Sequence, residues 1–253
     1  MSDGKLAGRT AVVTGGNSGI GQALAVGLAR AGANVAVWAR NVDRSAAVVD
    51  EIRALGVKAI AVQCDIADEQ SVDTAMARTV EELGPLGCFV ANAGIADAAP
   101  ITEMSLDSWH RVLRTNLDGG FLCTRAAARR FVTQGTGGSI IVVSSTISRY
   151  GGAGQAAYAA SKTGLIGLAR TLAVELARYQ VRCNILIPGW TRTAMNTHLQ
   201  ADERFMKATT ARTPARRWAD PEEFYEVAAF LADPSLTFHT GNEVVVDGGY
   251  TIF

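Results

Sequence analysis

The sequence predicts a doubly wound α/β fold, in which about seven parallel strands form one sheet and helices cover both of its faces. Short runs rich in Val and Ile alternate along the chain with longer segments of helical character. The runs show no polar alternation, which is typical of strands that are buried on both faces. A glycine-rich turn follows the first run and precedes the first helical segment. Right-handed crossovers then place helices on both faces of the sheet.

Each element follows from this alternation. The predicted strands are residues 10–14, 34–38, 59–63, 86–91, 139–144, 181–187 and 243–246. The predicted helices are residues 19–31, 43–55, 69–83, 107–133, 155–178 and 221–232. Asp220 before Pro221 is a helix start signal, and Gly32 and Gly56 are stop signals. No Pro-rich or Ser-rich linker divides the chain, so we expect one domain over residues 1–253.

Composition excludes several classes of protein. The chain has 253 residues, of which 48% are hydrophobic and 19% charged, so it is not intrinsically disordered. Lys and Arg number 24, as do Asp and Glu, whereas a nucleic-acid binder normally has a basic excess. The four cysteines are scattered, without a C-x-x-C pair or a His at ligand spacing. This pattern indicates a reducing compartment and no metal site.

The N-terminal region gives no membrane or secretion signal. The first ten residues, MSDGKLAGRT, lack the apolar stretch of a signal peptide. The longest uncharged stretch, residues 11–29, contains Gly, Asn, Ser, Thr and Gln and would be a poor membrane span. We therefore expect a soluble cytoplasmic protein whose partner is a small molecule rather than a membrane or a nucleic acid.

The glycine-rich turn is the first motif with chemical content. Residues 14–21 read TGGNSGIG, with the spacing G-x3-G-x-G. Glycines let the backbone turn tightly and approach a pyrophosphate, and the following helix N-terminus offers free N–H groups. A tight turn without a ligand is the alternative. Its place between the first strand and the first helix favours a dinucleotide site and a Rossmann fold.

The end of the second predicted strand indicates which dinucleotide binds. A fold that selects NAD usually places a carboxylate there, on the ribose hydroxyls. Here the chain has Ala39 followed by Arg40, whose guanidinium can pair with a 2′-phosphate. A solvated surface arginine is the alternative. We predict that NADP(H) is preferred over NAD(H).

Tyr158 and Lys162 form a candidate acid–base pair, because residues i and i+4 share a helix face. Lowering a tyrosine pKa from about 10 to about 7 requires roughly 4 kcal/mol. Two unit charges about 4 Å apart interact by about that amount at an effective dielectric of 20. Ser145 follows a predicted strand, where its hydroxyl can reach a substrate carbonyl. The alternatives are a surface helix pair and a turn cap, and for Ser144 we favour the cap.

The motifs in this order resemble the short-chain dehydrogenase/reductase family, in its shorter type. The resemblance covers essentially the whole chain and rests on TGGNSGIG at 14–21, ANAG at 91–94, Asn116, Ser145, YAASK at 158–162 and PGWTRT at 188–193. It implies an NAD(P)(H)-dependent oxidoreductase that interconverts a carbonyl and a secondary alcohol. Its implied catalytic residues are Asn116, Ser145, Tyr158 and Lys162.

The resemblance also implies roles for individual residues. Tyr158 would transfer the proton, Ser145 would polarise the carbonyl, and Asn116 would support a water linked to Lys162. Lys162 would lower the Tyr158 pKa and hold the nicotinamide ribose. With the glycine turn and Arg40, the expected cofactor site comprises Gly15, Asn17, Ser18, Gly19, Ile20, Gly21, Arg40, Asp65, Ile66, Asn92, Gly94, Tyr158, Lys162, Pro188, Gly189, Thr191 and Thr193. Two departures are Ala91, where the family's N-N-A-G motif has Asn, and Ser18, where some members carry a basic residue.

The substrate is less defined by the sequence. The expected pocket residues are Ala96, Ile147, Gln155, Trp190 and Met195. Residues 190–217 form an expected lid, which carries six basic residues against two acidic ones. An acidic substrate is one interpretation of this charge, but we favour a mobile lid with a solvated face.

Other classes of function are less consistent with the sequence. A catalytically silent dinucleotide-binding regulator is the main alternative, although such a protein would be expected to lack part of the catalytic set. A serine hydrolase needs G-x-S-x-G, and a P-loop enzyme needs Lys where Gln22 follows Gly21. The helix after Tyr158 is apolar on more than one face and must be covered. The resemblance implies that such helices pair in a homotetramer.

Overall fold

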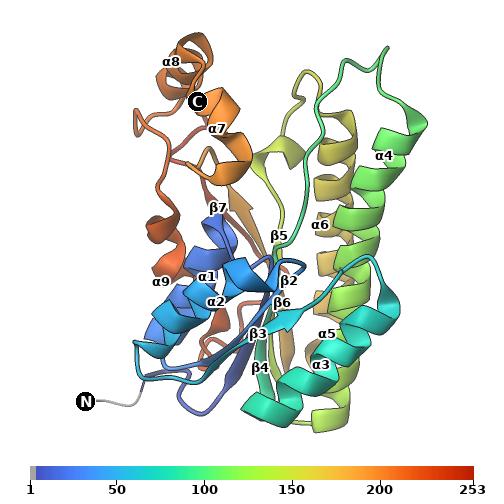
Figure 1. Ribbon diagram of the computed structural model, residues 1–253, viewed down its shortest axis with the longest axis vertical. Coiled ribbons are helices and arrows are strands. Elements are labelled where there is room, and N and C mark those ends of the chain that lie inside the picture. The colour runs from blue at the N-terminus through green and yellow to red at the C-terminus, as the bar shows by residue number, and fades with distance from the viewer. Residues whose placement is uncertain (1–3) are drawn as a thin grey trace.

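The computed structural model describes residues 4–253, which contain one seven-stranded sheet (Figure 1). Its strand order is β3-β2-β1-β4-β5-β6-β7, and every neighbouring pair is parallel. The strands are β1 (Thr10–Thr14), β2 (Asn34–Ala39), β3 (Ala59–Gln63), β4 (Leu86–Ala91), β5 (Gly138–Val143), β6 (Val181–Pro188) and β7 (Glu243–Val246). The predicted doubly wound α/β fold is confirmed.

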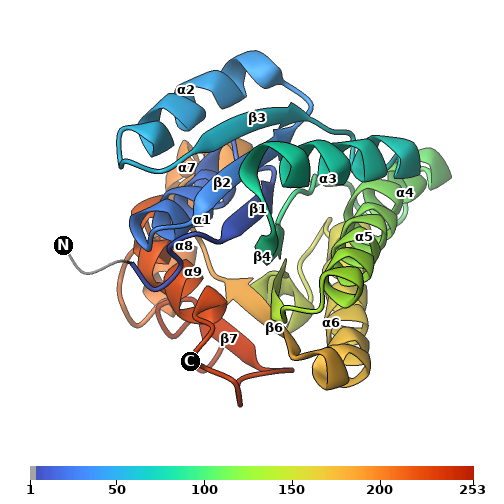
Figure 2. The ribbon, with the colours of Figure 1, turned by 90° about the horizontal axis from the view of Figure 1, so that it is seen from below.

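Two layers of helices cover the sheet (Figure 2). One face carries α1 (Gly19–Arg30), α2 (Val42–Arg53) and α9 (Tyr225–Ala232). The other face carries α3 (Glu69–Leu83), α5 (Gly119–Gln134) and α6 (Ala156–Leu176). Because side chains alternate along a strand, neighbouring residues of β1 serve different layers. Val12 packs under α3, α5 and α6, and Val13 packs under α1, α2 and α9.

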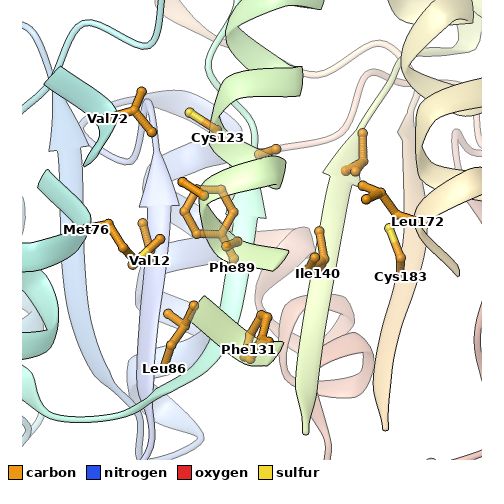
Figure 3. Close-up of a cluster of buried hydrophobic side chains, with 14 of the residues drawn as sticks. Val12, Val72, Met76, Leu86, Phe89, Cys123, Phe131, Ile140, Leu172 and Cys183 are labelled. Carbon is orange, nitrogen blue, oxygen red and sulfur yellow. The ribbon is translucent and has the colours of Figure 1, made fainter. Parts of the chain in front are cut away.

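The core under α3, α5 and α6 is drawn in Figure 3. Phe89 of β4 and Ile140 of β5 are fully buried there, together with Phe131 of α5. Trp38 of β2 packs its ring edge-on against Phe89, and its indole Nε1 donates to Thr79 Oγ1 at 2.9 Å. This buried apolar layer packs the helices against the central strands, whose carboxyl ends carry the site residues.

The predicted helix over residues 107–133 is interrupted. It consists of α4 (Leu106–Leu113), a π-helical turn at Arg114–Asp118, and α5. Such turns often occur at functional sites, because the extra residue re-aims a side chain. Here the turn contains Asn116, which is only 1% exposed.

The predicted lid contains helices, although no helix was predicted there. Residues 190–217 contain two short helices, α7 (Thr197–Gln200) and α8 (Glu203–Arg212), which lie at the same end of the sheet as the C-terminus (Figure 1). The predicted helix at 221–232 begins with a 3-10 turn, and α9 starts only at Tyr225. In the part of the chain that the structure describes, no helix has both the length and the apolar character needed to cross a membrane.

Candidate active site

The glycine positions of the turn between β1 and α1 have no room for a side chain. Gly15 and Gly19 adopt positive φ values of 63° and 53°, a region that favours glycine. A Cβ on Gly21 would lie 2.2 Å from the Gly15 carbonyl oxygen and 2.4 Å from Asn92 Nδ2. A pyrophosphate could therefore approach the backbone closely at the N-terminus of α1, which is the environment that a dinucleotide requires.

Thr14 and Asn92 join this turn to the end of β4. The Thr14 hydroxyl accepts hydrogen bonds from the backbone N–H groups of Asn92 and Ala93, each at 3.0 Å. It also donates to the Val90 carbonyl oxygen at 3.3 Å. Asn92 Nδ2 donates back to the Thr14 carbonyl oxygen at 2.9 Å. The sequence singled out Asn92, but Thr14 appeared there only as the first letter of the motif.

The adenosine side of the expected cofactor site is more open. Arg40 is exposed directly after β2, and Asn17 Nδ2 donates to the Asn41 carbonyl oxygen at 3.1 Å. Asp65 is exposed after β3, with its Oδ1 accepting from the Ala67 N–H at 3.0 Å. Ile66 is only 7% exposed and packs in the core, so it offers a ligand its backbone rather than its side chain.

An open pocket of about 430 Å³ lies beside the glycine turn. Asn17, Ser18 and Gly19 form one wall. The other walls include two arginines, Arg44 and Arg192. Arg44 was not among the expected cofactor residues, because it lies inside α2 rather than at the strand end.

Asn116 ties the π-helical turn to the segment after β4. Its Oδ1 accepts from the Ile95 N–H at 2.8 Å, and its Nδ2 donates to the Ile95 carbonyl at 2.9 Å. Nδ2 also lies 3.0 Å from Ser161 Oγ on α6. A Cβ on Gly94 would lie 3.1 Å from Asn116 Oδ1 and 3.5 Å from Lys162 Nζ. The structure thus brings Gly94, Asn116 and Lys162 together, and the Asn116 side chain is committed to protein partners.

Lys162 and Tyr158 lie on one face of α6, as expected, but their contacts differ from the expectation. Lys162 is 3% exposed, its Nζ donates to the Val143 carbonyl at 2.9 Å, and Nζ lies 5.7 Å from the Tyr158 ring centroid. Burial lowers the pKa of Lys162 to about 8. Burial also raises the pKa of Tyr158, and a hydrogen bond with Ser145 partly offsets this. The expected role of Lys162 in lowering the Tyr158 pKa stays a prediction for the complex with the oxidised cofactor.

Ser145 and Ser144 follow β5 and have different partners. Ser145 has extended backbone, caps the 3-10 turn Thr146–Ser148, and accepts from the Ile147 N–H at 3.3 Å. Ser145 therefore caps this turn and also contacts Tyr158. Ser144 is not a cap: its buried hydroxyl donates to the Lys162 carbonyl at 2.8 Å, which ties β5 to α6.

The expected substrate residues separate into two groups. Ile147 and Gln155 meet at Gly152, where a Cβ would lie 2.6 Å from Ile147 Cδ1 and 3.4 Å from Gln155 Cγ. Ala96 is exposed, and Met195 is 56% exposed on the 3-10 turn before α7. Trp190 is partly buried and stacks on Trp218 with ring centroids 5.0 Å apart.

The two ends of the predicted lid, residues 190–217, are joined by backbone hydrogen bonds. The Arg192 N–H donates to the Ala219 carbonyl, and the Ala219 N–H donates to the Trp190 carbonyl, both at 2.9 Å. We call this paired segment, formed by Trp190, Arg192 and Ala219, the neck. Thr191 is buried in it, and the Thr191 hydroxyl donates to the Gly189 carbonyl at 3.1 Å. Thr193 packs over the glycine turn, because a Cβ on Gly19 would lie 3.0 Å from its Cγ2. Pro188 ends β6 just before the neck.

Aromatic rings fill the space under the lid. Phe205 of α8 packs edge-on against Trp190, at 5.2 Å between centroids. Tyr250, near the C-terminus, lies 6.4 Å from Trp190 and 5.5 Å from Tyr150. The Trp218 indole donates to Thr209 Oγ1 at 2.9 Å. The side of the lid that faces the protein is therefore packed, which a fully solvated loop would not be.

The part of the chain that the structure describes has no set of side chains placed to bind a metal ion. Residues 4–253 contain no group of three or more His, Cys, Asp or Glu side chains placed to hold a metal ion. The pocket beside the glycine turn is lined by Arg44 and Arg192 and by one carboxylate residue, Glu51. Tyr158 and Lys162 lie on α6, where they could transfer a proton.

Known proteins resemble this chain over its whole length. A family model described as Enoyl-(Acyl carrier protein) reductase matches residues 15–251. The chain is 38% identical to L-rhamnose 1-dehydrogenase (NAD(P)(+)) of Sphingomonas sp. strain SKA58, over 96% of each chain. It is 41% identical to cis-4-hydroxycyclohexanecarboxylate dehydrogenase of Sinomonas cyclohexanicum, again over 96% of each.

A solved structure agrees with these relatives. The gluconate 5-dehydrogenase of Burkholderia cenocepacia J2315, in complex with NADP and tartrate, has a TM-score of 0.94 and 36% identity, and the match covers 99% of this chain and 98% of that one. The glycine turn, the Ser145–Tyr158–Lys162 grouping and these matches together show that the chain belongs to the short-chain dehydrogenase/reductase family.

Proposed function

We propose that Tyr158 is the general acid/base with which this chain interconverts a ketone and a secondary alcohol. The chain is an NAD(P)(H)-dependent oxidoreductase that acts on CH–OH groups. The observation that carries the assignment of Tyr158 is its meeting with Ser145 beside buried Lys162. This grouping lies at the carboxyl ends of the central strands, where ligands of open α/β sheets bind.

The chemistry divides between the cofactor and the chain. When bound, the nicotinamide ring supplies or accepts the hydride. In the reducing direction Ser145 donates a hydrogen bond to the substrate carbonyl oxygen, and Tyr158 gives that oxygen its proton as the carbon receives the hydride. Burial keeps Tyr158 protonated, which suits a proton donor. In the oxidising direction the proton returns to Tyr158, and the Lys162 ammonium stabilises the phenolate.

A carbonyl panel tests this proposal. The protein is mixed with NADPH, binding is followed by nicotinamide fluorescence, and turnover is followed by loss of the nicotinamide absorbance. Turnover of at least one ketone or aldehyde is expected. Binding of NADPH without turnover across the panel would favour the silent regulatory protein instead.

Preference for NADP(H) rests on Arg40, which is exposed at the end of β2 where it can reach a 2′-phosphate. The NADP-bound gluconate 5-dehydrogenase structure supports the same cofactor. Comparing kcat/KM for NADPH and NADH tests the preference. Equal or better use of NADH would reject it.

A homotetramer is the proposed assembly. Large apolar side chains are exposed on α5 and α6, namely Phe121, Val132 and Val174, and Val174 is 80% exposed. Gly167 on α6 faces open space, because a Cβ there would meet no heavy atom within 4 Å. These features support helix pairing between copies. Light scattering after size exclusion should give about four times 26.6 kDa, and a stable monomer would contradict the assembly.

We also infer a single catalytic domain with a substrate lid at residues 190–217, in a reducing cytoplasmic compartment. The backbone pairing between Trp190 and Ala219 supports the lid as a distinct segment. The four cysteines are buried free thiols, which supports the compartment.

A further inference from the structure

Arg212, the last residue of lid helix α8, is held by two tyrosines. Its Cζ lies 4.3 Å from the ring centroid of Tyr250 and 5.1 Å from that of Tyr150. One of its terminal nitrogens, Nη1, donates to the Tyr250 hydroxyl at 3.4 Å. The two rings come from distant parts of the chain and lie 5.5 Å apart. A guanidinium over aromatic faces keeps most of its N–H donors free for another partner.

The Arg212 guanidinium has no carboxylate partner within residues 4–253, where no Asp or Glu oxygen lies within 4.0 Å of it. Two other lid arginines do have such partners, since Arg192 pairs with Asp220 at 3.2 Å and Arg217 pairs with Glu223 at 2.5 Å. Two of the six basic residues of the lid are therefore paired with carboxylates, whereas Arg212 is not paired with any carboxylate of the described residues.

The carboxylate closest to Tyr250 in the sequence is used by its own turn. Asp247 Oδ1 accepts from the Gly249 N–H at 2.9 Å. Its Oδ2 accepts from the Thr251 N–H at 2.8 Å and from the Thr251 hydroxyl at 2.6 Å. Asp247 is therefore not the counter-ion of Arg212, although the two residues flank the same aromatic cluster.

The position of Arg212 relates it to the reacting groups. Tyr150 belongs to the same connection as Ser145, between β5 and α6, and its hydroxyl lies 3.4 Å from Thr146 Oγ1. Trp190, on the other side, directly follows the expected cofactor residue Gly189. The buried Trp190 Nε1 has no acceptor within the described part of the chain. Trp190 thus places a buried N–H donor, without a partner among the described residues, beside the same aromatic cluster.

We propose that Arg212 binds the carboxylate of an acidic substrate, so that this enzyme acts on small hydroxy acids and keto acids. The inference rests on the proposed function, because it names the substrate class of the same site. The planar guanidinium can accept a carboxylate in a bidentate arrangement, and the aromatic walls cover the carbon skeleton. The carboxylate lies away from the reacting carbon, which stays at Ser145 and Tyr158.

Paired substrates separate this role from a structural one. The test compares 4-oxocyclohexanecarboxylate with its neutral amide, using wild type and Arg212→Gln. The variant should lower kcat/KM for the acid by roughly 10- to 100-fold, mainly through KM, because a hydrogen-bonded charge pair is lost. The amide should be turned over equally well by both proteins. Arg204→Gln is the matched control, because Arg204 lies on the same helix and is exposed like Arg212 but is not held between the two tyrosine rings; it should change neither rate.

Three results would overturn the proposal. The first is an equal loss of kcat/KM for the acid and the amide in Arg212→Gln, which would indicate that Arg212 only fastens the lid. The second is a wild type that does not prefer the acid over the amide. The third is an Arg212→Gln variant with the same preference for the acid as the wild type. Thermal midpoints of both variants show whether the fold is intact.

A binding measurement keeps this inference distinct from the proposed function. Unreactive cyclohexanecarboxylate is titrated against the protein with NADP⁺ present, and tryptophan fluorescence is followed. Saturable binding that Arg212→Gln removes supports the carboxylate site even where no ketone is reduced. In that case the oxidoreductase assignment of this site is wrong but the anion site stands. Binding that is unchanged in Arg212→Gln counts against the site, whatever the turnover.

Discussion

Lys162 is expected to destabilise the folded protein, because its ammonium is buried without a carboxylate partner. Replacing it by Met keeps a long unbranched side chain and removes the charge. The Lys162→Met variant should therefore be more stable than wild type at about pH 7, although the proposed mechanism requires it to lose activity. Function and stability would then oppose one another at this one residue.

The size of the effect follows from the pKa. Burial lowers the Lys162 pKa from 10.5 to about 8. At about 1.36 kcal/mol per pKa unit, the charged form costs about 3 kcal/mol below pH 8. The variant also loses the hydrogen bond to the Val143 carbonyl, which contributes about 1 kcal/mol. The net gain is about 2 kcal/mol, or about 4–8 °C in Tm for a chain of this length.

The stability of the wild type should change with pH in a definite direction. Between pH 8 and 10.5 the unfolded chain keeps the Lys162 proton while the folded chain loses it, so wild-type stability rises with pH over this window. Lys162→Met lacks this titration. The extra stability of Lys162→Met over wild type should therefore be fully present below about pH 8 and should shrink toward pH 10.

Urea denaturation followed by tryptophan fluorescence measures the difference at about pH 7 and about pH 10, at one protein concentration for all samples. Lys207→Met, at an exposed position of α8, is the matched control and should show no pH-dependent difference. The reasoning would be refuted by a Lys162→Met protein that is no more stable than wild type at pH 7. An advantage of the same size at both pH values would also refute it.

Three further substitutions test the site. Tyr158→Phe should lower kcat by at least about 10²- to 10⁴-fold while NADPH binding, measured by fluorescence, survives; a near-wild-type kcat would contradict the mechanism. Arg40→Ala should lower kcat/KM with NADPH by roughly 10- to 100-fold and leave NADH unaffected, and equal losses with both cofactors would argue against a phosphate contact. Gly21→Ala would place a Cβ 2.2 Å from the Gly15 carbonyl oxygen, so it should abolish cofactor binding in a fluorescence titration. Gly167→Ala is its control, since its Cβ meets no atom within 4 Å, and an unchanged NADPH affinity in Gly21→Ala would count against the tight turn.

The sheet could be predicted closely because its strands are buried on both faces. The predicted bounds of β1, β3, β4 and β7 match the structure, β2 and β6 each extend one residue further at the C-terminal end, and β5 is shifted by one residue at both ends. A strand covered on both sides needs apolar residues at every position, so burial is visible as a continuous run. The glycine turn was equally visible, because a close backbone approach at Gly21 admits no side chain.

The helical interruptions could not be predicted in this way. The π-helical turn around Asn116 adds one residue to a helix whose apolar pattern continues on both sides. The two lid helices are short and polar, and packing of Phe205 against Trp190 stabilises them through contacts outside their own sequence. Short segments of this kind depend on tertiary packing more than on propensity.

Local spacing also gave an incomplete account of Lys162 and Arg212. The i, i+4 relation placed Lys162 beside Tyr158, but its ammonium is bound by the Val143 carbonyl of another element. Arg212 was one of several basic lid residues in the sequence. Its two tyrosine partners lie far away along the chain, and only the fold brings them to it.

The neck of the lid has a consequence for the evolution of this protein. The backbones of Trp190, Arg192 and Ala219 pair where the chain leaves the sheet and returns to it, so both ends of the excursion are fixed. The entropic cost of a longer loop grows only slowly with its length. Insertions, deletions or replacement after Thr193 and before Ala219 would therefore leave Ser145, Tyr158 and the cofactor site where they are. Descendants of this gene could acquire new substrates by exchanging one continuous stretch of coding sequence while they inherit the chemistry unchanged.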